Sequence, residues 1–201
     1  MDRILLAPLF PHHAQATTES SLKHAYKHLS EMEWSPGIVE LGHFEKDPSF
    51  IGPLVESIRP HLDEETHLLF SYHGLPLSHI YRADKSGSHC LKVENCCAIK
   101  TEGNASCYAH HCTMTTLSVV EALGLDDDSW SQSYQSRLGP VKWLRPSSIE
   151  KVDQLVESGI KKLTVVSPAF VADGLETMEE LDIEIRNQFM EAGGGQMELV
   201  S

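Results

Sequence analysis

The sequence predicts an α/β fold with parallel β-sheets, because short apolar runs alternate along the chain with longer segments of helical periodicity. The composition agrees with a folded globular protein. Of the 201 residues, 41% are hydrophobic and 22% are charged, which excludes the disordered and collagen-like classes. A chain of this length is expected to form one or two domains.

The first half of the chain predicts three strands separated by two helices. The opening apolar run, 4–10, ends at Pro11, as a buried parallel strand would. The helical spacing of Ile51, Val55 and Ile58 indicates the second helix. The expected strands are 4–10, 37–41 and 67–71, and the expected helices are 17–29 and 49–62.

The second half begins with a long irregular segment, 75–103, that contains Pro76, Gly87 and Gly103. Loops of this length in compact domains are usually functional. Beyond it the pattern predicts helices at 107–123, 147–158 and 175–192, alternating with strands at 130–135, 163–167 and 196–200.

The charge balance limits the partners. The chain has 29 acidic and 16 basic side chains, a net charge of −13, and the sequence contains no concentrated basic patch. A phosphate backbone would be repelled, so we expect no nucleic-acid partner. The apolar runs fall far short of the ~20 residues that span a bilayer. We therefore expect a cytoplasmic protein with no transmembrane segment and at most peripheral membrane contact.

Two strand ends carry candidate catalytic residues. His73 follows the predicted strand 67–71 and lies where ligands of parallel α/β sheets bind, beyond the carboxyl ends of the strands. Position alone is also compatible with a histidine that merely ends a strand. Glu176 lies where another strand leads into a helix, and the helix dipole stabilises a carboxylate there. It is equally compatible with a simple helix-start acid.

A third segment, 134–146, contains Arg137, Trp143 and Arg145. It offers a flat apolar ring and cations, which suit a planar ligand that bears carboxylates. Taken alone, Trp143 could equally cover the edge of a core.

Taken together and in this order, these segments resemble the ferrochelatase family. The resemblance rests on Ser-Tyr-His-Gly-Leu-Pro at 71–76, Tyr-Gln-Ser-Arg at 134–137 with Trp-Leu-Arg-Pro at 143–146, and Ala-Phe-Val-Ala-Asp-Gly-Leu-Glu-Thr at 169–177. The segments Leu-Ala-Pro-Leu-Phe-Pro at 6–11 and Ala-Gly-Gly-Gly at 192–195 match the same family, so the resemblance covers nearly the whole chain.

The resemblance implies the chelatase fold, a pair of doubly wound, Rossmann-like parallel-sheet domains with a porphyrin cleft between them. Chains of this family normally begin earlier, so the first domain, 1–65, would be incomplete, and the second would span 66–201. The abrupt chain ends, with an apolar strand at each, agree with this expectation.

The implied activity is a lyase reaction of haem biosynthesis, the insertion of Fe²⁺ as substrate into protoporphyrin IX. The reaction removes two pyrrole protons, so a base is needed close to the ring. The resemblance assigns catalysis and contact with the iron to His73 and Glu176. It implies porphyrin contacts for Tyr72, Arg137, Trp143 and Phe170.

Two points qualify the resemblance. Gly174 stands where many relatives carry histidine or cysteine, so no third metal ligand is expected there. A chelatase for another metal or tetrapyrrole shares this fold and stays an alternative.

All five cysteines lie in an insert at 88–112. A secreted disulfide scaffold would spread its cysteines and usually contain an even number, so an intracellular metal or cluster site is favoured. Four thiolates suit a 2Fe-2S cluster, and the insert resembles an internal cluster segment of some bacterial ferrochelatases. The expected ligands are Cys90, Cys97, Cys107 and Cys112, with Cys96 as the alternative to Cys97.

Two other interpretations of the insert stay open. A structural zinc site could use four cysteines, or three with His89, His110 or His111, although the spacing does not match a two-residue zinc knuckle. The chain could also be a non-catalytic iron–sulfur sensing module, which need not bind porphyrin.

Overall fold

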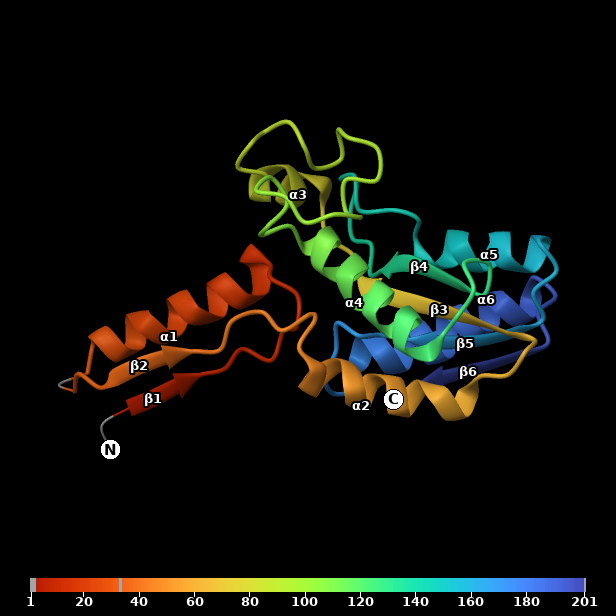
Figure 1. Ribbon diagram of the computed structural model, residues 1–201, viewed down its shortest axis with the longest axis horizontal. Coiled ribbons are helices and arrows are strands. Elements are labelled where there is room, and N and C mark those ends of the chain that lie inside the picture. The colour runs from red at the N-terminus through yellow and green to blue at the C-terminus, as the bar shows by residue number, and fades with distance from the viewer. Residues whose placement is uncertain (1–2, 33, 201) are drawn as a thin grey trace.

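The structure is a computed structural model that describes residues 3–32 and 34–200. Its strands form two parallel sheets, so the α/β class predicted from the sequence is confirmed (Figure 1). In the smaller sheet β1 (Arg3–Leu6) pairs with β2 (Gly37–Glu40). The larger sheet has the order β4 (Trp130–Gln135), β3 (Thr66–His73), β5 (Lys162–Val166), β6 (Gln196–Val200).

Helices connect the strands in the predicted alternation. The smaller sheet is accompanied by α1 (Ser20–Ser30), which follows a π-helical turn at Gln15–Glu19. The remaining helical elements are α2 (Pro48–Ile58), a 3-10 turn (Arg59–His61), α3 (Leu77–Ala83), α4 (Tyr108–Leu123), α5 (Ser148–Glu157), a π-helix (Glu176–Ile185) and α6 (Arg186–Glu191).

Helices cover both faces of the larger sheet, as in a doubly wound fold. On one face α2 packs beside α4, and the core there includes Ile58 and Phe70. On the other face the core includes Val152, Leu163 and Leu181 from α5, β5 and the π-helix. Each such side chain contributes roughly 2 kcal/mol by leaving water, so this sheet is the stable centre of the chain.

The packing of α2 differs from the predicted domain organisation. Its buried residues, Ile51, Val55 and Ile58, belong to the same core as β3. By packing, α2 therefore lies with the larger sheet, although it precedes the boundary predicted after residue 65. Periodicity could identify the helix but not the sheet that it covers.

Two helical segments differ from expectation. The predicted irregular segment 75–103 contains α3, whose seven residues are too few to show a helical period in the sequence. The single helix predicted over 175–192 is a π-helix followed by α6. Side-chain periodicity does not distinguish these two backbone geometries well over ten residues.

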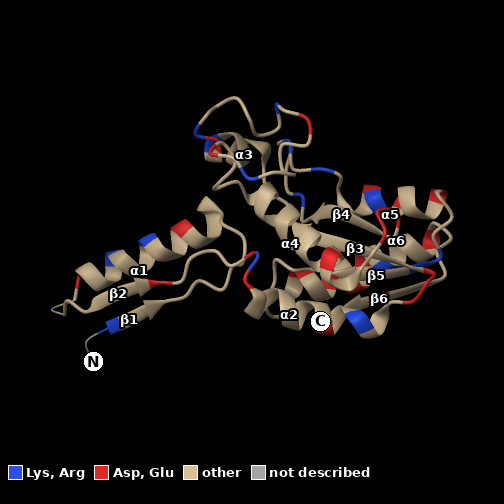
Figure 2. Cartoon of the chain, viewed as in Figure 1, with Lys and Arg blue, Asp and Glu red and all other residues tan. Residues whose placement is uncertain are grey.

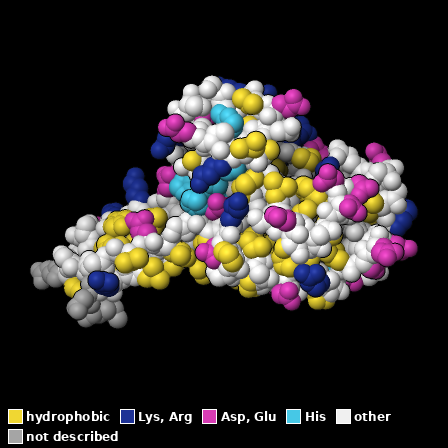
Figure 3. Space-filling model, viewed as in Figure 1, with side chains coloured by type: hydrophobic (Ala, Val, Ile, Leu, Met, Phe, Trp, Pro, Cys, Tyr) yellow, Lys and Arg dark blue, Asp and Glu magenta, His cyan; other side chains and the backbone are white. Residues whose placement is uncertain are grey.

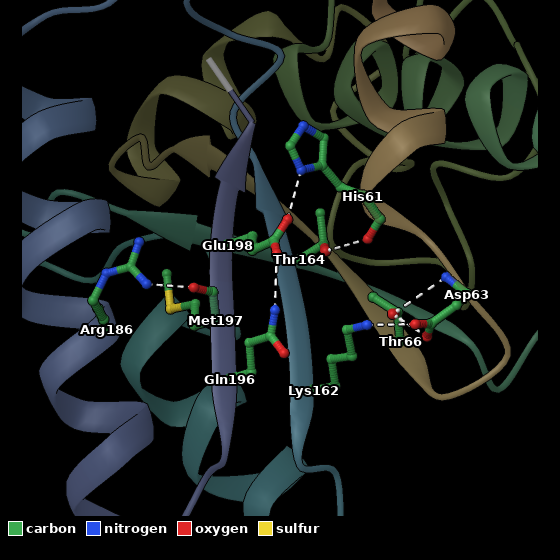
Figure 4. A network of polar contacts seen from close by, with 9 residues as sticks. All are labelled: His61, Asp63, Thr66, Lys162, Thr164, Arg186, Gln196, Met197 and Glu198. Atoms are coloured by element: carbon green, nitrogen blue, oxygen red, sulfur yellow. Dashed lines mark hydrogen bonds and ion pairs between the residues drawn. The ribbon is translucent and has the colours of Figure 1, made fainter.

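A polar network joins elements near the amino ends of the strands of the larger sheet (Figure 4). The His61 Nδ1 atom donates to Glu198 at 2.6 Å, and the Thr164 hydroxyl donates to the carbonyl oxygen of His61 at 2.9 Å. Lys162 pairs with Asp63, which links the start of β5 to the turn before β3. The predicted functional residues lie at the opposite, carboxyl ends of these strands.

Acidic and basic residues are interspersed over helices and loops (Figure 2). Within residues 3–32 and 34–200, no helix combines the length and apolar character needed to cross a membrane.

Candidate functional site

The segments that follow β3 and β5 border a cavity of about 280 Å³. His73, Phe170 and Glu176, all predicted site residues, line it together. Phe10 and Pro11, from the segment after β1, contribute further lining. The fold therefore brings three predicted residues to one cavity, although more than 90 positions separate His73 from the other two.

His73 ends β3 and is half-buried. Its Nδ1 atom lies 2.7 Å from the carbonyl oxygen of Gly74, and because a carbonyl oxygen can only accept, Nδ1 carries a proton. In the neutral ring, Nε2 then keeps a free lone pair that can take a proton or bind a metal ion. The Tyr108 hydroxyl donates to the His73 carbonyl at 2.8 Å, which fixes the backbone at this strand end.

Glu176 is the first residue of the π-helix and is half-buried. π-helical segments are rare and frequently occur at functional sites. A Cβ atom added to Gly174 would lie 3.3 Å from the Glu176 Oε2 atom, so glycine leaves this carboxylate room. The Gln135 side-chain amide donates to the Glu176 carbonyl at 3.4 Å, which links the π-helix to β4.

Arg137 and Trp143, both predicted to contact porphyrin, line a second cavity of about 360 Å³. Arg137 is exposed, and the Trp143 indole N–H donates to the Leu138 carbonyl at 3.0 Å. Gly74 also lines this cavity, whereas its neighbour His73 lines the first one. The 73–77 segment therefore separates the two cavities.

Tyr72 was expected near the macrocycle, but it lines neither of these cavities. Its ring is fully buried, and its hydroxyl lies 2.8 Å from the Thr116 hydroxyl. The Tyr72 ring meets the His12 ring edge to face at a centroid distance of 5.2 Å. In this structure Tyr72 therefore packs behind a residue that lines the His73 cavity.

That residue, His12, was not identified from the sequence. The Thr115 hydroxyl donates to the Glu45 carbonyl and therefore accepts from His12 Nε2, at 2.9 Å. His12 Nδ1 is buried and has no hydrogen-bond partner among the described residues. Burial lowers the pKa of His12 to about 3, so the ring is neutral. The sequence feature that could have indicated His12 as a site residue is its position directly after the Leu-Ala-Pro-Leu-Phe-Pro motif.

The predicted cluster ligands are only partly brought together. The Cys107 thiol interacts with those of Cys90 and Cys97, and the sulfur atoms of Cys96 and Cys97 are 3.9 Å apart. Cys112 is fully buried in the core, beside Tyr108. The thiols of Cys90, Cys96, Cys97 and Cys107 thus form a chain of contacts. Cys112 has no such contact, although it belongs to the same buried apolar cluster as Cys90 and Cys107.

The electrostatics of these thiols favour one thiolate. The Cys97 thiol and the backbone N–H groups of His110 and Ala109 lower the pKa of Cys107 below its usual value. Cys107 precedes α4 directly, where the helix dipole also stabilises an anion. Burial, by contrast, raises the pKa of Cys112 well above its usual value, and it raises the pKa of Cys90 as well. Cys107 is therefore the thiol best prepared to bind a metal.

Two further residues, which were not identified from the sequence, order the cysteine-rich segment 88–112, here called the cysteine loop. The Asp84 carboxylate accepts hydrogen bonds from the backbone N–H groups of His89 at 2.8 Å and Cys90 at 2.9 Å. The fully buried Asn104 side chain donates to the carbonyls of Cys96 at 2.8 Å and Ile99 at 2.9 Å. These bonds order a loop that has few large apolar side chains of its own.

The three histidines considered as zinc ligands support the same loop. Each has a ring nitrogen within hydrogen-bond distance of a loop carbonyl oxygen: His89 with Cys96 at 2.9 Å, His110 with Cys97 at 2.8 Å and His111 with Ala105 at 3.1 Å. Carbonyl oxygens accept, so these ring nitrogens are protonated donors and not ligand atoms.

Comparisons with known proteins agree with this geometry. The family model described as Ferrochelatase matches residues 1–201. The chain is 42% identical over 200 residues to the ferrochelatase of Pseudomonas fluorescens (strain Pf0-1), covering 98% of this chain and 59% of that protein. It is 41% identical over 201 residues to the ferrochelatase of Stutzerimonas stutzeri (strain A1501), with the same coverage.

The chain thus spans 59% of the length of these two curated relatives. The residues matched by the family model, 1–201, include His73, Glu176 and all five cysteines. The family model and these two relatives all point to one family. The chain belongs to the ferrochelatase family.

Proposed function

We propose that this protein inserts Fe²⁺ into protoporphyrin IX to form haem. The observation that carries the proposal is the lining of one cavity by His73 and Glu176, together with apolar residues such as Phe10 and Phe170. Apolar walls suit a macrocycle, and two polar groups directed to the same space suit a metal ion and a proton.

The chemistry assigns a role to each polar group. Metal insertion releases two pyrrole protons, and the free Nε2 lone pair of His73 supports this residue as proton acceptor or iron ligand. Glu176 supplies a carboxylate to the same cavity, as a partner that binds the iron or relays a proton. Arg137 and Trp143, in the neighbouring cavity, would contact the porphyrin periphery.

Substitution of the histidine tests this proposal. His73→Ala in the native protein should abolish iron insertion, because the proposed proton acceptor or iron ligand is removed from the cavity, and Glu176→Gln should reduce it at least tenfold. The measurement is the rate of haem formation from protoporphyrin and Fe²⁺. His24→Ala, at an exposed position on α1, is the control and should retain full activity. Full turnover by His73→Ala would contradict the assignment.

We also propose that the cysteine loop binds a 2Fe-2S cluster. The Cys107 thiol contacts those of Cys90 and Cys97, and the Cys96 sulfur lies 3.9 Å from that of Cys97, so we propose these four as ligands in place of a set that includes Cys112. The cluster would supply redox chemistry and would cross-link a polar loop through its cysteine ligands. Asp84 and Asn104 would hold the loop in position around it.

Metal, sulfide and porphyrin-binding analysis of the protein purified without air distinguishes the cluster from a zinc site and the chelatase from an iron–sulfur sensing module. A red-brown protein with two irons and two sulfides per chain is expected, and the same sample should bind porphyrin. Colourless protein that contains zinc would contradict the cluster. A coloured protein that ignores porphyrin would favour the iron–sulfur sensing module over the chelatase.

The proposed location is the cytoplasm, with porphyrin and Fe²⁺ as ligands, no nucleic-acid partner and at most peripheral membrane contact. The net charge of −13 supports the lack of a nucleic-acid partner and of strong membrane contact, since it disfavours both polyanions and anionic lipid surfaces.

A further inference from the structure

A group of metal-binding side chains lies outside both sites described above. His43, Glu45 and His111 each place one ligand atom within 4.8 Å of the other two. His43 and Glu45 belong to the segment between β2 and α2, whereas His111 is in the first turn of α4. Histidine side chains gather on the surface where the smaller sheet meets the rest of the chain (Figure 3).

We propose that His43, Glu45 and His111 bind one divalent transition-metal ion of the Zn²⁺ or Fe²⁺ type. Two imidazoles and one carboxylate form a common donor set for such ions, which leaves further positions for water. Ligands of one tetrahedral ion lie about 3.4 Å apart, given metal–ligand distances near 2.1 Å. Modest side-chain rotations would therefore bring the three ligand atoms from their present separations, within 4.8 Å, to the distances needed to bind one ion.

The carboxylate and one imidazole are already in contact. His43 Nδ1 donates to Glu45 Oε2 at 2.6 Å, and the rings of His43 and His111 are stacked with centroids 4.4 Å apart. The Glu45 side chain is only 12% exposed. A carboxylate with so little access to water gains from a cation that neutralises it.

The hydrogen bonds of His111 are those expected of a histidine that binds a metal ion. Its Nε2 atom donates to the Ala105 carbonyl at 3.1 Å, and its Nδ1 atom accepts the backbone N–H of His13 at 3.1 Å. Metal-bound histidines usually donate their other ring N–H to a carbonyl in this way. Binding through Nδ1 would keep the Ala105 bond and replace only the bond from His13.

The backbone that carries the ligands is held in place independently of them. The Thr115 hydroxyl, one turn beyond His111, donates to the Glu45 carbonyl at 2.7 Å. The Phe44 backbone N–H donates to the Pro11 carbonyl at 3.0 Å. Lys46 and Lys100 are the neighbouring cations, but both are exposed and screened by water. The ion would thus connect the segment after β2 to α4.

Cobalt titration of the whole protein with its cysteines intact tests the site. Co²⁺ bound by nitrogen and oxygen gives visible d–d bands, whereas thiolate ligation adds an intense charge-transfer band in the near ultraviolet. We expect Glu45→Gln and His43→Ala each to weaken binding of one Co²⁺ equivalent at least tenfold, without loss of any charge-transfer band. Glu45→Gln keeps the shape of the side chain, and His43 is exposed, so both variants should fold.

The control is a second group of two histidines and one glutamate. His24 and His28 on α1 have Nε2 atoms 3.1 Å apart, and His28 pairs with Glu31, but all three are exposed. His24→Ala should leave the Co²⁺ affinity and stoichiometry unchanged. Unchanged binding in both Glu45→Gln and His43→Ala would overturn the proposal, and so would loss of the same equivalent in His24→Ala.

Discussion

At the residue scale, the five cysteines differ in their contacts with one another. The Cys96 sulfur accepts the backbone N–H of Leu91 at 3.3 Å and lies beside Cys97, whereas Cys112 is fully buried next to Tyr108. A thiolate at Cys112 would be costly in that apolar surrounding.

Single Cys→Ser variants test which thiol is the fourth cluster ligand. We expect Cys96→Ser to lose most bound iron and sulfide, as Cys90→Ser, Cys97→Ser and Cys107→Ser should. Cys112→Ser should retain them, because serine fills nearly the same space and the Cys112 thiol has no contact with the other four thiols. Iron and sulfide analysis with visible absorption is the measurement. The reverse result for Cys96 and Cys112 would restore the ligand set expected from the sequence.

A buried histidine far from these sites makes stability depend on pH. Burial lowers the pKa of His67 from the ordinary 6.5 to about 4, and its Nε2 atom lies 2.9 Å from the Ser131 hydroxyl. Between pH 6.5 and 4 the unfolded chain therefore takes up a proton that the folded chain does not. The free energy of unfolding falls there as the pH falls, by up to about 1.4 kcal/mol per pH unit.

His67→Gln should remove this contribution while keeping a partner for Ser131. The free energy of unfolding of the variant, from urea titrations at several pH values, should decline less steeply between pH 6.5 and 4 than that of the unchanged protein. His24→Gln, at an exposed histidine, should reproduce the unchanged slope. A His67→Gln slope equal to that control would show that His67 does not titrate differently on folding.

At the element scale, the carboxyl ends of β3 and β4 depend on one glycine. The Gly74 N–H donates to the Gln135 carbonyl at 2.7 Å, and an added Cβ would lie 2.8 Å from that oxygen and 3.3 Å from the Trp143 ring. Glycine thus lets the chain leave β3 close to β4, between the two cavities.

Gly74→Ala should destabilise the protein by about 1–3 kcal/mol, because the two strand ends must move apart to admit the methyl group. It should also slow iron insertion, since His73 precedes it. The matched control is Gly52→Ala in α2, where no atom lies within 4 Å of the added Cβ. That variant should gain about 0.5–1 kcal/mol from its higher helix propensity. Equal thermal unfolding midpoints for the two variants would contradict the close approach.

At the scale of the whole molecule, the two sheets differ in burial. Leu5 and Val39 in the smaller sheet are 62% and 50% exposed, and α1 has no buried residue. β3, in contrast, is buried along nearly its whole length between two layers of helices. Local stability follows buried apolar contacts, so it should be unequal along the chain.

Hydrogen exchange on this chain measures that inequality. Backbone amides of β1, β2 and α1 should exchange at rates approaching those of an unstructured peptide, because little apolar surface is buried there. Amides of β3 and β5 should exchange only through global unfolding. Similar protection in both sheets would mean that the smaller sheet is stabilised by contacts with another part of the protein or another molecule.

The sequence by itself determined the elements and the family. Periodicity is a local property, so the strands 130–135 and 196–200 were predicted with the bounds that the structure shows. The motifs around His73 and Glu176 could be placed after predicted strands from this same local pattern. The order of the motifs along the chain indicated the ferrochelatase family.

Only the tertiary structure decided which distant side chains meet. It placed Tyr72 in the core, joined α2 to the larger sheet, and left Cys112 outside the contacts among the other four thiols. It also brought His43 and Glu45 to His111, across more than 60 residues of chain. Such proximities depend on how helices pack against sheets and how a loop folds back on itself, and no local period in a sequence encodes those distances.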